Sequence, residues 1–127
     1  MFLVDPLSRQ PVYEQIIAQV ERFVLSGVLK AGDQLPSVRS LSVTLSINPN
    51  TIQKAYYDLD RRDILQTVPG KGCFISEHAR QHNCEQKRGE LNALDELVRE
   101  LALAGVTEQE LNARIQRIYD QRRAKTL

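Results

Sequence analysis

The chain has 127 residues, a formal net charge of +1 and a hydrophobic fraction of 42%. This length suits one ordinary domain or a small domain with an appendage, and the apolar content is sufficient for a packed core. No apolar run approaches the ~20 residues that cross a bilayer, which argues against a membrane protein. The near-neutral charge means that a nucleic-acid function cannot be argued from overall charge.

The first residues of the chain carry no basic stretch followed by a long apolar run, so they do not resemble a secretory signal. Cys73 and Cys84 are the only cysteines. Without export they are expected to remain reduced thiols rather than to form a disulfide. We therefore expect a cytoplasmic protein.

Residues 12–26 are predicted to form the first helix, because apolar side chains recur there at spacings of three and four. Gly27 ends this helix. A connector follows over residues 28–36, with a turn at Gly32-Asp33 and short apolar pairs on either side.

Two short helices joined by a tight turn are predicted next. Ser37 can cap the first helix, Asn48 can cap the second, and Pro49 suits the first helical position of the second. The second helix has an apolar stripe that we expect to be buried, made of Ile52, Ala55, Tyr56 and Leu59. Its opposite stripe is polar and made of Asn50, Gln53, Lys54, Tyr57 and Arg61. Amide, hydroxyl and ammonium groups on one exposed helix face suit the major groove of DNA.

A β-hairpin is predicted after these helices. Residues 64–68 and 73–76 are short and β-prone, and a glycine-flanked basic tip around Lys71 joins them. Three helices followed by such a hairpin predict a winged helix-turn-helix over residues 1–76. The fold class is mainly α with a small β wing (α+β).

The local charge pattern supports contact with DNA only modestly. Arg39 and Lys54 are the charged residues between Gln34 and Tyr57, and no acid appears there. The proposed binding surface is therefore expected to be free of carboxylates but only mildly basic, so useful affinity is expected to need two copies.

Residues 77–89 are polar and are interpreted as a linker, and residues 90–127 are predicted to form a helical hairpin. Gly105 can end its first helix, and Thr107 and Glu110 form a capping box for the second. The apolar side chains at spacings of three and four are Leu91, Leu94, Leu97, Val98, Leu101, Leu111, Ile115 and Ile118. So small a hairpin rarely buries enough apolar area to be stable alone, so we expect it to pair with its twin in a homodimer. The alternative is that it packs on its own winged helix.

Several motifs together resemble the GntR family of bacterial transcription regulators. They are Tyr13-Glu14-Gln15-Ile16, the run from Gly27 to Arg39, Asn50-Thr51, Ala55-Tyr56, and Gly70-Lys71-Gly72 before Phe74-Ile75. The short tail and Asn48-Pro49-Asn50-Thr51 resemble the YtrA-type branch. The resemblance implies a homodimer that binds double-stranded operator DNA, often as a repressor of genes that include transporter operons.

The resemblance also implies which residues contact DNA. Arg39 follows the Leu-Pro-Ser motif, where the family has a DNA-contacting arginine, and Ser37 is assigned with it. The start of the recognition helix and the wing tip, which enters the minor groove, supply the rest of the implied set: Asn48, Asn50, Thr51, Gly70, Lys71 and Gly72. The outer face of the helix adds Gln53, Lys54 and Tyr57.

This chain departs from the family pattern at three positions. Many relatives carry arginines where it has Pro49 and Gln53, so a guanine-reading arginine is absent from both. Glutamine pairs with adenine, which leads to the hypothesis of an operator richer in A·T at those steps. The usual glycine at the end of the third helix is Asp63, which can adopt the left-handed conformation only at some cost.

Other functions have weaker support. His78, His82 and Cys84 could offer metal ligands, but they lie in the predicted linker without an obvious fourth ligand, so no metal or other cofactor is predicted. The chain shows no catalytic triad and no Gly-rich phosphate loop that opens a helix, so it is not expected to be an enzyme.

A protein-interaction module on a winged-helix scaffold remains the alternative function. An unknown small-molecule effector would need the dimer interface or the space between tail and winged helix, because the tail is too short to enclose a pocket of ~300 Å³.

Overall fold

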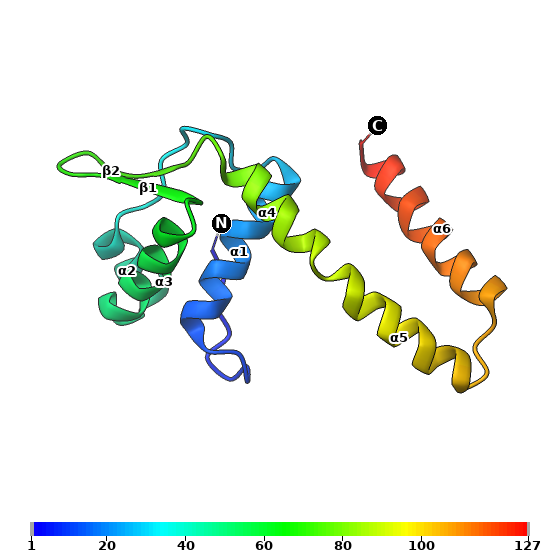
Figure 1. The fold of residues 1–127 in the computed structure, drawn as a ribbon. Coiled ribbons are helices and arrows are strands. Elements are labelled where there is room, and N and C mark those ends of the chain that lie inside the picture. The colour runs from blue at the N-terminus through cyan, green and yellow to red at the C-terminus, as the bar shows by residue number, and fades with distance from the viewer. Residues whose placement is uncertain (1, 127) are drawn as a thin grey trace. The chain divides into compact units, whose positions relative to one another are not determined.

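The computed structural model describes residues 2–126, which fall into two units divided between Arg88 and Gly89 (Figure 1). The first unit contains α1 (Val12–Ser26), α2 (Val38–Leu45), α3 (Pro49–Arg61), β1 (Leu65–Val68), β2 (Gly72–Ile75) and α4 (Ala79–Arg88). The second unit contains α5 (Leu91–Leu103) and α6 (Glu108–Thr126). The predicted fold class, mainly α with a small β wing, is confirmed. Among the described helices, none is both long and apolar enough to cross a membrane.

The core of the first unit lies between α1 and α3, which pack side by side (Figure 1). Ile16 and Val20 of α1 and Ile52 and Leu59 of α3 are completely buried. The apolar stripe predicted for α3 is buried along its whole length, and the polar stripe is exposed. The side of α3 that faces away from α1 is therefore available to a partner.

Side-chain caps fix the starts of α2 and α3 where the sequence predicted them. The Ser40 backbone N–H donates to Ser37 Oγ at 3.0 Å, and the Asn50 N–H donates to Asn48 Oδ1 at 2.8 Å. Between the helices, Ser46 adopts the left-handed conformation with φ of 55°. These local signals set the angle at which the second helix leaves the first.

The wing contains more backbone pairing than the predicted hairpin. β1 and β2 are antiparallel, as expected. The connector before α2 also pairs with β2: the Leu35 N–H donates to the Cys73 carbonyl at 2.9 Å, and the Ile75 N–H donates to the Asp33 carbonyl at 2.8 Å. The wing is thus tied to the segment that leads into the helix-turn-helix.

The segment predicted as a linker, residues 77–89, is largely helical, and that interpretation was wrong. α4 packs on α1 and belongs to the first unit. Asn83 is 2% exposed and donates from Nδ2 to the Glu21 carbonyl, and Arg80 Nη1 donates to the Leu25 carbonyl at 2.7 Å. The helix docks through polar contacts and one small side chain, Ala79, so it lacks the apolar stripe by which helices are predicted from sequence.

The second unit has the two helices predicted for the tail, running in opposite directions from the turn at Gly105 (Figure 1). The Glu110 N–H donates to Thr107 Oγ1 at 3.2 Å, which confirms the predicted cap. No side chain of α5 is buried, and Leu97 remains 55% exposed. The other apolar side chains of the tail that remain at least one-third exposed in the single chain are Leu91, Leu94, Val98, Leu103, Ile115, Ile118 and Tyr119.

Candidate nucleic-acid interface

The outer face of α3 and the wing border an open hollow of about 570 Å³. Its lining residues come from α2, α3, β1 and β2, and they are Val38, Asn50, Gln53, Lys54, Tyr56, Tyr57, Asp60, Thr67 and Cys73. The structure thus brings together the predicted residues Asn50, Gln53, Lys54 and Tyr57. Amide groups and a largely exposed tyrosine ring on a rigid helix suit base edges and the sugar–phosphate backbone.

The N-terminus of α3 presents the predicted Asn48, Asn50 and Thr51. Asn48 uses Oδ1 to cap the helix, so its amide nitrogen is the group that can face a partner. Asn50 is exposed and Thr51 is half-buried. The positive end of the helix dipole adds attraction for a phosphate at this end, although the first N–H groups of α3 are already satisfied: Pro49 has none, and those of Asn50 and Thr51 donate to Asn48.

Arg39 is exposed in the first turn of α2, and that turn contains no acidic residue. Ser37 is also exposed, but its side chain accepts the helix-capping hydrogen bond. The side chain of Arg39 is therefore accessible to a partner, whereas the side chain of Ser37 starts the helix that carries Arg39.

The side chain of Lys54 is held by a contact with Tyr13 that was not predicted from the sequence. Its Nζ lies 3.9 Å from the centroid of the Tyr13 ring on α1, which is a cation–π geometry. The ammonium therefore sits against the neighbouring helix in the free protein. No sequence signal identifies this pair, because the two residues are far apart in the chain.

A carboxylate borders the interface, contrary to the predicted carboxylate-free surface. Asp60 lines the hollow, and its Oδ2 accepts hydrogen bonds from the Thr67 N–H at 3.1 Å and from Thr67 Oγ1 at 2.6 Å. The charge pattern that predicted this surface covered residues 34–57, and Asp60 lies one turn of α3 beyond it. These two bonds anchor the wing strand β1 to the recognition helix.

Tyr56 lies behind the hollow and has a structural role, as expected. Its side chain is buried, and its hydroxyl donates to the Pro36 carbonyl at 2.7 Å. Burial raises the pKa of the Tyr56 phenol far above its ordinary value, and the electrostatic effect of the nearby Cys73 raises it further. Tyr56 therefore ties α3 to the start of α2 as a neutral hydrogen-bond donor.

The wing tip exposes the predicted basic group. Gly70 and Gly72 have φ angles of +77° and +121°, conformations that favour glycine, and Lys71 between them is exposed. The Lys71 N–H donates to the Val68 carbonyl at 3.0 Å, and Gln34 Nε2 donates to the Lys71 carbonyl at 3.0 Å. The sequence analysis did not identify Gln34 as part of this tip.

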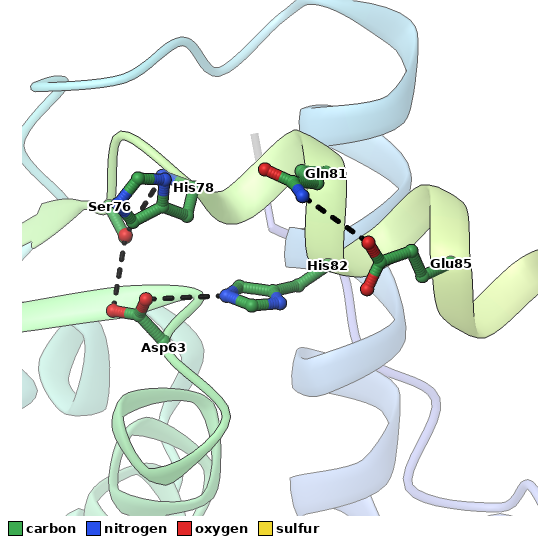
Figure 2. Close-up of polar contacts among 6 residues, drawn as sticks. All are labelled: Asp63, Ser76, His78, Gln81, His82 and Glu85. Atoms are coloured by element: carbon green, nitrogen blue, oxygen red, sulfur yellow. Dashed lines mark hydrogen bonds and ion pairs between the residues drawn. The ribbon is translucent and has the colours of Figure 1, made fainter.

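Asp63, which stands where the family pattern has glycine, lies at the junction of α3, the wing and α4. It adopts the left-handed conformation with φ of 59°, as expected for this position. Figure 2 shows its carboxylate between Ser76 Oγ at 3.2 Å and His82 Nε2 at 3.3 Å. These bonds give Asp63 a function that glycine could not supply.

The histidines considered as metal ligands meet each other at this junction. The rings of His78 and His82 are 6.3 Å apart and nearly perpendicular (Figure 2). Cys84 is a half-buried free cysteine further along α4. Within residues 2–126, no three histidine, cysteine or carboxylate side chains are gathered so that they could hold a metal ion.

Comparison with known proteins places this geometry in context. Residues 12–75 match the family model described as bacterial regulatory proteins, gntR family. The chain is 41% identical over 119 residues to the HTH-type transcriptional repressor YtrA of Bacillus subtilis (strain 168), covering 93% of this chain and 92% of that protein.

Solved structures agree with the sequence match. A transcriptional regulator from Oenococcus oeni superimposes with a TM-score of 0.74 at 32% identity, covering 94% of this chain and 99% of that chain. The structure of AraR(DBD) in complex with operator ORX1 matches with a TM-score of 0.52 at 26% identity, covering 59% of this chain and 93% of the AraR chain.

Proposed function

The chain belongs to the GntR family of bacterial DNA-binding transcription regulators, which are not enzymes, and we propose that it acts as a homodimeric repressor on a pseudo-palindromic operator. In this proposal, α3 of each copy lies in the major groove and the wing tip reaches the adjacent minor groove. The observation that carries the proposal is the exposed polar face of α3 beside an exposed glycine-flanked lysine.

The homodimer rests on the apolar side chains of the tail. Of those repeating at spacings of three and four along α5 and α6, Leu101 and Leu111 are half-buried and the others are exposed in the single chain. Covering one leucine-sized side chain yields ~1.5–3 kcal/mol, so pairing these faces across a two-fold axis would yield substantial free energy. We propose Leu91, Leu94, Leu97, Val98, Leu101, Leu111, Ile115 and Ile118 as the dimer contacts.

The resemblance to the YtrA-type branch supports a proposal about the cellular location and the class of target genes. We propose that the protein works in the cytoplasm and that its targets include a transporter operon. We propose that a small-molecule effector would bind at the dimer interface, because a hairpin of this length is too short to enclose a pocket of ~300 Å³ by itself.

Selection of bound sequences from a random DNA pool tests the DNA-binding proposal. We expect an enriched two-fold pattern with half-sites about 10 bp apart, or a multiple of that spacing. Arg39→Ala should abolish binding to the selected operator, while Arg22→Ala, which removes an exposed arginine of α1, should not. No enriched sequence, or equal affinity of wild type and Arg39→Ala at matched salt, would contradict the proposal.

Sedimentation equilibrium tests the dimer separately. Leu97→Asp places a carboxylate in the proposed contact and should give a monomer. Leu103→Asp is the matched control, because Leu103 is 83% exposed on the same helix but lies outside the proposed contacts. A dimer that survives Leu97→Asp would favour the alternative in which the tail does not pair with its twin.

A further inference from the structure

Gln34 contacts the wing tip from outside the hairpin. It lies in the connector before α2, where its backbone forms an isolated antiparallel bridge with Phe74 of β2. Its side-chain amide crosses to the tip and donates from Nε2 to the Lys71 carbonyl at 3.0 Å. Backbone pairing on each side of this bridge, at Asp33 and Leu35, fixes the position from which the amide reaches.

The tip is shaped to accept this amide. A Cβ atom built on Gly72 would lie 2.7 Å from Gln34 Nε2, closer than such atoms normally approach. Gly72 is thus needed for its positive φ and for the space that the glutamine occupies. Two features of the tip therefore concern the Gln34 amide: the hydrogen bond to the Lys71 carbonyl and the space left by the absent side chain of Gly72.

We propose that Gln34 is a positioning residue for DNA binding, which holds the wing tip so that Lys71 enters the groove in a fixed orientation. This inference rests on the proposed contact between the wing and DNA. The Lys71 peptide is held at both ends, by its own N–H on the Val68 carbonyl and by Gln34 on its carbonyl. Without the amide, the tip would have to be ordered when DNA binds, at a cost to affinity.

The test is a double-mutant cycle on the operator recovered from the random pool. Gln34→Met keeps the length of the side chain and removes the amide donor. One exposed hydrogen bond suggests a loss in operator affinity of about 3- to 10-fold for each engaged wing. Because Gln34 acts through Lys71, adding Gln34→Met to Lys71→Ala should cause little further loss.

Gln66→Met is the matched control, since Gln66 is an exposed glutamine on the neighbouring strand β1. Any effect it has should add to that of Lys71→Ala. Gly72→Ala displaces the same amide and also strains the backbone at φ of +121°, so its loss should be at least as large as that of Gln34→Met. Circular dichroism at each step should show the same secondary structure in all variants.

The outcomes separate the inference from the proposed function. If wild type selects no operator, the proposed function fails and the inference falls with it. If Lys71→Ala weakens binding but Gln34→Met does not, or if the two losses multiply independently, the positioning role alone is refuted. If Lys71→Ala has no effect, the wing contact that Gln34 is proposed to support is absent, which also overturns the inference.

Discussion

Replacing Tyr56 by phenylalanine should destabilise the first unit at neutral pH and make it less sensitive to alkali. The change removes one hydroxyl, which donates to the Pro36 carbonyl at 2.7 Å from a buried side chain. Losing such a bond costs about 1 kcal/mol. For a unit of this size, that corresponds to a decrease in Tm of about 4–8 °C.

The pH dependence follows from the raised pKa of the buried phenol. In the unfolded chain Tyr56 ionises near its ordinary pKa of ~10, whereas in the folded chain it remains neutral. Its contribution to stability is therefore complete below about pH 10 and is lost as the pH rises above that value. At pH 11 the loss amounts to about 1.4 kcal/mol, and the phenylalanine variant does not share it.

Urea unfolding of wild type and Tyr56→Phe, followed by circular dichroism at pH 8 and pH 11, measures both effects. The free energies of unfolding should differ by about 1 kcal/mol at pH 8, and the advantage of wild type should disappear by pH 11. Other titrating groups are common to both proteins and cancel in the difference. A difference that stays constant over this range would refute the claim that Tyr56 is buried as a neutral donor.

Substitutions at three further positions test separate parts of the chain. Asp63→Gly and Asp63→Ala both remove the contacts with Ser76 and His82, but only alanine keeps a Cβ at φ of 59°. The glycine variant should therefore be more stable than the alanine variant by about 1 kcal/mol in urea unfolding. Equal unfolding midpoints of the two variants would rule out backbone strain at Asp63. Thr107→Ala removes the cap of α6 and should lower the stability of the tail by about 1 kcal/mol, seen as weaker dimerisation in sedimentation; an unchanged dimer constant would contradict this. Lys71→Ala should make the salt dependence of operator binding shallower by about one unit per wing, so a change near two would indicate two engaged wings and a change near one only a single wing.

The elements with strong local signals could be predicted from the sequence. The first three helices have apolar stripes, α2 and α3 also have capping side chains, and the structure places all three at the predicted positions. The helix α4 could not be predicted in this way. Its docking depends on Asn83 and Arg80 meeting backbone carbonyls of α1, and polar residues in a polar segment give no periodic pattern.

The candidate site was predictable in its composition but not in its internal contacts. The exposed face of α3 follows from which side of the helix is apolar. The contact of Lys54 with Tyr13, the bonds of Asp60 with Thr67 and the reach of Gln34 to the wing tip all join segments distant in sequence. Such pairs depend on how distant segments pack in three dimensions. Local sequence patterns such as periodicity and capping residues do not show which distant residues will meet.

The interface has little charge with which to hold DNA. Lys54 rests on an aromatic ring, Asp60 adds a carboxylate next to the groove, and Arg39 and Lys71 are the remaining cations of the proposed set. Most of the proposed contacts come instead from neutral amides and from the N-terminus of α3, which act only at short range and in the correct orientation. One copy should therefore bind weakly. If two copies join through the tail, as proposed, the second contact becomes intramolecular and affinity rises without any new type of contact. On this reasoning, substitutions that break the proposed dimer should weaken operator binding even though they leave α3 and the wing unchanged.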